Sequence, residues 1–176
     1  AFDLGLRALL LAAVVKPLWQ QPSRRHLAFF HTLLALGCVH AGFYLALHRG
    51  SDAMPWLRLS IGLLMILIVV ALSRISMRLV NDVLETQGGF AAPYMARPPR
   101  RNLAIVAIAA YSLGAFLLPG NAVTGWLALA AAAAVFNLLN DWHVGRALGQ
   151  RWVLIPYLVY WCMALGYATI GWGLLT

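Results

Sequence analysis

The sequence predicts an all-α fold, a polytopic transmembrane bundle of about six helices with both ends of the chain on the periplasmic side. Hydrophobic residues make up 62% of the 176 residues, and charged residues only 10%. Soluble domains are about half apolar and about a quarter charged. The apolar residues form continuous stretches, whereas a membrane β-barrel would alternate apolar and polar residues. The chain is therefore expected to be one helical membrane domain over residues 1–176.

About six apolar stretches reach the length of a membrane-spanning helix, which is roughly 20 residues. In chain order they are residues 2–19, 27–47, 55–75, 103–118, 122–139 and 152–175. Glycine, proline and polar residues separate them, as expected for turns. The longest break, residues 81–102, contains Gly88, Gly89, Pro93, Pro98 and Pro99. We expect this break to be a cytoplasmic loop.

Basic residues collect in alternate breaks between the spans. The basic breaks contain Lys16, Arg24, Arg25, Arg74, Arg78, Arg97, Arg100, Arg101, Arg146 and Arg151. Arginine and lysine are retained on the cytoplasmic side of a membrane, so these breaks are predicted to lie inside the cell. The net charge of +8 then reflects topology and contact with the lipid bilayer, whose cytoplasmic leaflet is anionic. No nucleic-acid partner is expected.

The chain begins with Ala1, and an apolar stretch starts at once. A periplasmic start placed directly on a helix indicates that earlier spans of the same protein precede it. The partners expected beside the lipid bilayer are therefore those missing helices, or a larger membrane complex.

His40 is the most informative polar residue at membrane depth. An imidazole inside the bilayer needs a hydrogen-bond partner or a metal, and neutral imidazole is a good ligand for haem iron or copper. Cys38 is two residues away, so on a helix it points nearly the opposite way and cannot easily share an ion with His40. A hydrogen-bonded interior histidine is the alternative interpretation.

Two further groups of polar residues lie at the predicted inner ends of helices. Arg74, Arg78 and Asp82 recur every four residues and form one stripe, which could hold an anion such as a haem propionate. Anchoring by positive charge, with an Arg78 to Asp82 ion pair, explains the stripe equally well. Asp141, together with Asn140 and His143, could bind a metal, although a solvated helix end is the preferred interpretation there.

Three segments carry a resemblance to a known family. The segment AFDLGLRALLLAAVVKPLWQQPSRRHLAF and the following LGCVHAGFYL resemble the NnrS family, which has an early Asp, a basic turn and a helix with a late His. The segment SRISMRLVNDVLE is similar to the family's GGRxIPxFTxN signature, with Arg74 at its arginine and Asn81 near its asparagine. The segment RWVLIPYLVYWCMALGYATIGWGLL resembles the closing helix, LGYAWLxLGLLLLG.

This resemblance implies a multi-pass protein of the bacterial inner membrane that contains haem and copper and is linked to nitric oxide stress and denitrification. It implies that His40 binds a metal and that Arg74, Arg78 and Tyr157 contribute to cofactor binding. The chain also departs from the family pattern. The early WHxHEMxFG motif is absent, Ser73 replaces the second glycine of the signature, and Tyr157 replaces the histidine of the closing helix.

Two other classes of function fit the same sequence. One is a non-catalytic accessory subunit that packs its helices against a larger respiratory complex. The other is a small transporter, which is weakened by the lack of intramembrane acidic residues and of interrupted helices. No catalytic residue is predicted, because no positioned acid, base or open metal site can be identified.

Overall fold

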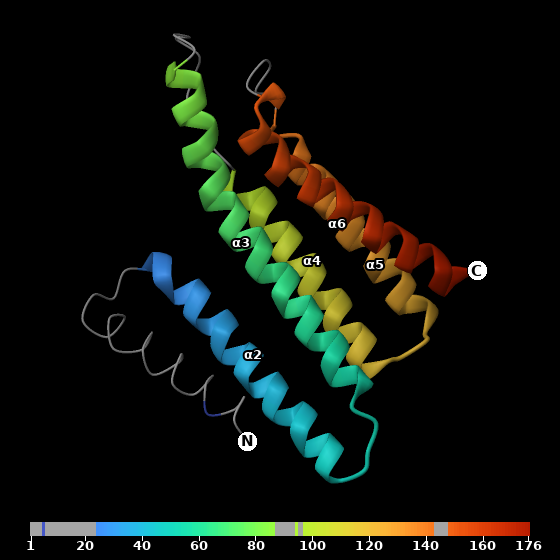
Figure 1. The fold of residues 1–176 in the computed structure, drawn as a ribbon. Coiled ribbons are helices and arrows are strands. Elements are labelled where there is room, and N and C mark those ends of the chain that lie inside the picture. The colour runs from blue at the N-terminus through green and yellow to red at the C-terminus, as the bar shows by residue number, and fades with distance from the viewer. Residues whose placement is uncertain (1–4, 6–23, 87–93, 95–96, 143–147) are drawn as a thin grey trace. The chain divides into compact units, whose positions relative to one another are not determined.

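The computed structural model of the chain describes residues 5, 24–86, 94, 97–142 and 148–176 (Figure 1). Within these residues the chain forms helices and no strand, which confirms the predicted all-α class. The helices are α2 (Arg24–His48), α3 (Met54–Thr86), α4 (Pro98–Leu117), α5 (Ala122–Leu139) and α6 (Arg151–Leu175). The predicted first span, residues 2–19, lies outside the described residues.

Three of these helices are long and apolar enough to cross a membrane, namely α3, α5 and α6. The hydropathy of α4 is lowered by Arg100, Arg101 and Asn102 in its first turns. That of α2 is lowered by its histidines, among them His40. The described residues therefore form a helical membrane protein with three candidate spans.

The helix bounds agree with the predicted spans except around the break at 81–102. Helix α5 covers the predicted residues 122–139, whereas α3 continues past the predicted end at 75 to Thr86. Helix α4 starts earlier than expected because Pro98 and Pro99 occupy its first positions, where no backbone N–H is needed. The connection between α3 and α4 is therefore shorter at both ends than the predicted loop.

The chain divides into two compact units, residues 1–67 and residues 68–176. The first unit contains α2 and the beginning of α3. A tight turn joins these helices, with Gly50 at φ 68°, a left-handed conformation that glycine adopts without strain. At the end of this turn the backbone N–H of Met54 donates to Oδ1 of Asp52 at 2.9 Å, which satisfies a donor at the start of α3.

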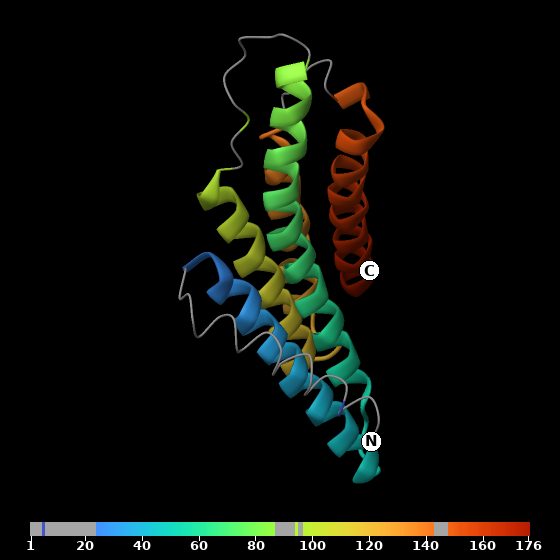
Figure 2. The same ribbon diagram turned by 60° about the vertical axis from the view of Figure 1, so that its left-hand side comes forward.

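In the second unit, α5 packs against both α4 and α6, and α5 and α6 lie side by side in both ribbon views (Figures 1 and 2). Small side chains allow this close packing. The buried residues of these helices include Ala104, Ala128, Ala131, Ala132, Ala134 and Ala164. A Cβ added to Gly171 of α6 would lie 2.9 Å from the backbone oxygen of Gly125 in α5. These two backbones therefore approach as closely as glycine permits.

The outer surface of the second unit is apolar. Large side chains such as Val106, Trp126, Trp152 and Trp172 are 64 to 70% exposed. Such residues are expected to face lipid in a membrane protein, where exposed apolar surface carries no penalty.

Among the described residues of α4 to α6 and their connections, charged side chains are confined to one end. Because α4, α5 and α6 alternate in direction, the start of α4, the end of α5 and the start of α6 meet at that end. It carries Arg97, Arg100, Arg101, Asp141 and Arg151. The opposite connection, residues 118–121, has no charged residue. The described part of this unit is thus strongly asymmetric in charge.

Candidate functional site

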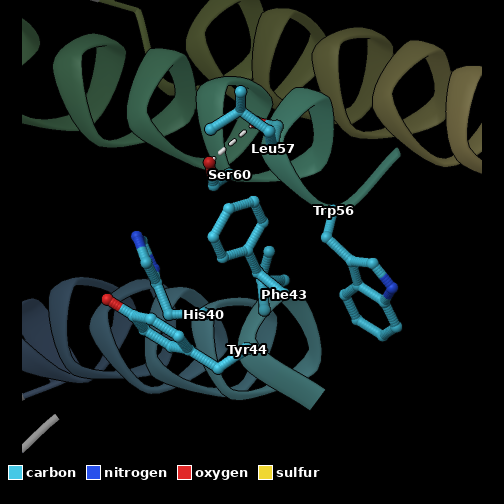
Figure 3. Close-up of a pocket in the computed structure, with 7 residues that line it drawn as sticks. His40, Phe43, Tyr44, Trp56, Leu57 and Ser60 are labelled. Carbon is cyan, nitrogen blue, oxygen red and sulfur yellow. Dashed lines mark hydrogen bonds between the residues drawn. The ribbon is translucent and has the colours of Figure 1, made fainter. Parts of the chain in front are cut away.

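A cavity in the first unit lies between α2 and the start of α3 (Figure 3). Its volume is about 190 Å³, below the roughly 300 to 1,000 Å³ of most ligand pockets. Apart from the histidine imidazole, no lining side chain is ionisable near neutral pH. The lining residues are Val39, His40, Phe43, Tyr44, Trp56, Leu57 and Ser60.

His40 is held in one tautomer by its own helix. Its Nδ1 lies 2.8 Å from the backbone carbonyl oxygen of Leu36, one turn earlier in α2. A carbonyl oxygen can only accept a hydrogen bond, so Nδ1 carries the hydrogen and donates it. In the neutral ring this leaves the lone pair on Nε2. Metal-binding histidines are oriented in the same way, by donating the other ring N–H to a carbonyl or carboxylate.

The first turns of α3 form the opposite wall of the cavity. The Ser60 hydroxyl donates to the carbonyl oxygen of Leu57 at 2.7 Å, as the dashed line in Figure 3 shows. The indole of Trp56 lies against Gly42 of α2, so closely that a Cβ added to Gly42 would overlap Cζ3 of the indole. Glycine at position 42 therefore permits the position of the indole that closes one side of the cavity.

Among the described residues of the first unit, the hydrogen bond to Leu36 orients His40 as a metal-binding histidine would be oriented. A haem iron needs a single proximal histidine, whereas copper sites usually use two or more nitrogen or sulfur ligands. Among the residues that the structure describes, His, Cys, Asp and Glu do not gather in groups of three or more. The cavity has room for an ion with small ligands, but its described walls do not enclose a haem. A haem or copper centre at His40 would need further ligands or walls beyond those described.

Arg74 and Arg78 lie one turn apart on α3, in the second unit. Arg74 is half-buried, while Arg78 and Asp82 are exposed. The predicted ion pair between Arg78 and Asp82 is not formed in the described part of the chain. Arg78 is therefore open to an anionic partner.

Tyr157 belongs to an aromatic cluster between α6 and the end of α5. Its ring centroid is 5.8 Å from that of Trp142 and 6.4 Å from that of Trp161. Trp142 also contacts Tyr94 at 5.7 Å and Tyr160 at 6.2 Å. Edge-on and tilted arrangements of this kind stabilise aromatic packing. The described contacts of Tyr157 are thus those of a packing residue.

The structure corrects the interpretation of Asp141 as part of a solvated helix end. The Asp141 side chain is only 6% exposed, and its Oδ1 accepts a hydrogen bond from Arg100 at 2.6 Å. Its Oδ2 accepts from the backbone N–H of Arg97 at 3.2 Å. No side-chain cap comes from Arg97 itself, so Asp141 caps the start of α4 from a distant part of the chain. The third member of the predicted metal group, His143, lies outside the described residues.

A second polar contact, which the sequence does not reveal, joins α3 to Tyr94. The side chain of Asn81 accepts from the backbone N–H of Tyr94 at 2.7 Å and donates to its carbonyl oxygen at 3.2 Å. The Tyr94 hydroxyl is hydrogen-bonded to Ser76. Burial of the ring raises the pKa of Tyr94 to about 12, and the negative charge of Asp141 adds to the increase.

The whole chain is similar to one known protein family. A profile described as NnrS protein matches residues 1–176, the whole of the chain. The chain belongs to the NnrS family. This confirms the resemblance found in its motifs. No curated protein and no solved structure matches the chain.

In this NnrS protein the predicted site residues are divided between the two units. His40 and its cavity belong to the first unit, and Arg74, Arg78 and Tyr157 to the second. Of these residues, His40 lines the cavity between α2 and the start of α3. The signal for Asn81 was present in the family signature, but the sequence did not indicate that its partner is the backbone of Tyr94.

Proposed function

We propose that this NnrS protein is a multi-pass protein of the bacterial inner membrane that holds haem or copper through His40 and acts in nitric oxide stress or denitrification. The observation that carries the proposal is the hydrogen bond from Nδ1 of His40 to the Leu36 carbonyl, which leaves Nε2 available beside a cavity. Membership of the NnrS family supports the inner-membrane location and the role in nitric oxide stress or denitrification.

The chain's own residues have defined tasks in this proposal. The Leu36 carbonyl fixes the tautomer and the ring orientation of His40. Phe43 and Trp56 give the cavity aromatic walls. When bound, the haem or copper would supply an open position for a small ligand such as nitric oxide. The contribution of Arg74, Arg78 and Tyr157 to cofactor binding, which the family resemblance implies, stays a prediction.

We also propose the complete topology of six spans, with both ends periplasmic and residues 81–102 cytoplasmic. The charge asymmetry of the second unit supports it, because arginines gather where α4 and α6 begin. Alkaline phosphatase fused after Thr176 is expected to be active, and the same fusion after Arg101 inactive. Activity at Arg101 and not at Thr176 would reverse the orientation.

The test of the cofactor proposal is purification of the full-length protein in mild detergent, followed by absorption spectroscopy and metal analysis. His40→Ala is compared with His48→Ala, which removes an exposed histidine from the end of the same helix. We expect a Soret band or stoichiometric copper that His40→Ala abolishes and His48→Ala retains.

Two other outcomes would contradict parts of the proposal. A cofactor that survives in His40→Ala would place the ligands on other residues. Absence of both haem and metal from well-folded wild-type protein would reject the cofactor role and favour the accessory-subunit alternative.

A further inference from the structure

We infer that the bilayer meets the second unit at two levels marked by exposed tryptophans, one at Trp152 and the other at Trp126 and Trp172. The surface between these levels contacts the acyl chains of phospholipids, and each tryptophan lies in a headgroup layer. The inference deepens the proposed topology and rests on it, because it assumes that the helices cross a membrane. It depends neither on haem or copper nor on the orientation of the chain.

The three tryptophans lie at opposite ends of the bundle. Trp126, Trp152 and Trp172 are 64, 70 and 69% exposed. Trp152 lies in the first turn of α6, whereas Trp172 lies in its last turn and Trp126 near the start of α5. Trp126 and Trp172 share one end, because their neighbours Gly125 and Gly171 are in contact. Tryptophan is enriched where a membrane meets water, since its ring is apolar and its N–H is polar.

The charged residues define the same two boundaries independently. Arg97 and Arg151 are exposed at the Trp152 end, and a charged side chain at the centre of a bilayer is costly. Residues 102–140 and 152–176 contain no charged residue. The hydrocarbon core therefore begins beyond the arginines and extends as far as the uncharged connection at 118–121.

The separation of the two levels matches the thickness of a hydrocarbon core. Trp152 and Trp172 are twenty residues apart in one helix, which at about 1.5 Å per residue is roughly 30 Å. The hydrocarbon core of a typical bilayer is also about 30 Å thick. Large exposed side chains between the two levels, such as Leu158 and Leu165, are apolar. Length, charge and exposure thus agree on the same pair of boundaries.

Helix α4 joins the same two levels. It begins with the arginines at the Trp152 end and reaches the connection at 118–121, which leads back to Trp126. It therefore crosses the hydrocarbon core together with α5 and α6, although the arginines of its first turns lower its hydropathy. At the headgroup level these arginines avoid the cost of burial in hydrocarbon and can meet lipid phosphate.

Depth-dependent quenching of tryptophan fluorescence tests the inference. The full-length protein is reconstituted into phosphatidylcholine vesicles whose acyl chains carry bromine either near the carbonyl end or near the methyl end. Each variant keeps one of the 7 tryptophans and has phenylalanine at the others. Trp161 is the control for depth, because it lies near the middle of α6 and is 38% exposed. Trp142, which is 6% exposed, is the control for burial.

We expect bromine near the carbonyl end to quench Trp126, Trp152 and Trp172 at least about twofold more strongly than bromine near the methyl end. Trp161 should show the reverse order, and Trp142 should be quenched little by either lipid. Stronger quenching of the three tryptophans by the deeper bromine would overturn the assigned levels. Absence of quenching by both lipids would show that another protein segment covers these rings, and would overturn lipid as their partner.

A second measurement avoids the tryptophan replacements in case those variants do not fold. A nitroxide is attached to the native Cys162, which is exposed near the middle of α6, or to Gly173→Cys beside Trp172, where an added Cβ meets open space. All other cysteines are replaced by serine. Dissolved oxygen should relax the nitroxide more than a water-soluble nickel chelate does at Cys162, and less at Gly173→Cys. Equal or reversed ratios at the two positions would overturn the inference.

These measurements fail separately from the tests of the proposed function. Quenching and relaxation report depth in the bilayer, whereas the phosphatase fusions report the side of the membrane and the spectra report the cofactor. Correct depths without a cofactor, or with the opposite orientation, would reject only the proposed function. A cofactor and the proposed orientation with wrong depths would reject only the assigned levels.

Discussion

Arg100 donates a hydrogen bond to Asp141 at 2.6 Å, although 41 residues separate them in the sequence. The pair joins the start of α4 to the segment that follows α5, and the Asp141 carboxylate also caps α4 through the backbone N–H of Arg97. A carboxylate this well buried depends on both partners. Removal of one partner is therefore expected to destabilise the charged end of the bundle, because it leaves a buried charge uncompensated.

Loss of the Arg100 side chain should destabilise this end of the protein. Arg100→Ala leaves the carboxylate of Asp141 buried and without its closest partner, which costs about 3 to 5 kcal/mol for a fully buried pair and somewhat less here because Arg100 is partly exposed. Thermal unfolding in detergent would measure the change. Arg151→Ala, at an exposed position, is the control and should shift the midpoint little. Equal shifts for the two variants would contradict a structural role for the pair.

The contact between Asn81 and Tyr94 should be separable into its two hydrogen bonds. Asn81→Asp keeps the acceptor for the Tyr94 N–H and loses the donor, whereas Asn81→Leu loses both. At about 1 kcal/mol for each bond, the second variant should lose roughly twice the stability of the first. Hydrogen exchange at the Tyr94 amide provides the local measurement, with protection retained in Asn81→Asp only. Protection that persists in Asn81→Leu would exclude the side-chain contact as its cause.

The close approach of α5 and α6 predicts opposite results for two neighbouring glycines. In Gly171→Ala the new Cβ meets the backbone oxygen of Gly125, which cannot move without the whole helix, so a loss of about 1 to 3 kcal/mol is expected. A Cβ at Gly173 meets open space, so Gly173→Ala should be neutral or slightly stabilising. Unfolding of both variants in the same detergent makes the comparison. A stable Gly171→Ala variant would show that the helices can separate there at little cost.

The raised pKa of Tyr94 predicts a loss of stability in strong alkali. Its pKa is about 12 in the folded protein, against an ordinary value of 10.0 for a solvated tyrosine, so the folded state favours the neutral phenol. The raised pKa contributes to the free energy of unfolding. This contribution is complete below pH 10 and disappears as the pH rises through about 12. The difference in unfolding midpoint between wild type and Tyr94→Phe should therefore narrow over that interval. Absorbance near 295 nm would follow the phenolate directly, and ionisation of Tyr94 near its ordinary pKa would contradict burial.

Much of the helical framework could be predicted from the sequence, because it depends on local properties. The apolar stretch at 122–139 is bounded by turn residues, and α5 has the same limits. The extension of α3 to Thr86 does not follow from hydropathy, because its last three turns mix polar and apolar residues. Hydropathy alone cannot distinguish a helix that projects beyond the membrane from a loop. Pro98 and Pro99 indicate a loop when read as turn residues, but the first helical positions also suit proline, and α4 begins there.

The polar contacts could not be predicted in the same way. Asp141 and Arg100 come from different helices, and nothing in their spacing indicates that they meet. The family signature drew attention to Asn81, but its partner is a backbone, which any residue at position 94 could provide. His40 was identified from its depth in an apolar stretch, while its cavity depends on Gly42 and Trp56, whose contact across two helices has no sequence pattern.

The contact between Gly125 and Gly171 has a consequence for the order of assembly. A ribosome delivers Gly125 to the membrane well before Gly171, and the turn between α5 and α6 is made in between. Gly125 lies near the start of α5 and Gly171 near the end of α6, so association that starts at the connection would bring these glycines together last. A bulky side chain at either position would therefore stop closure late, after insertion of both helices, and leave a splayed hairpin for membrane quality-control proteases to recognise.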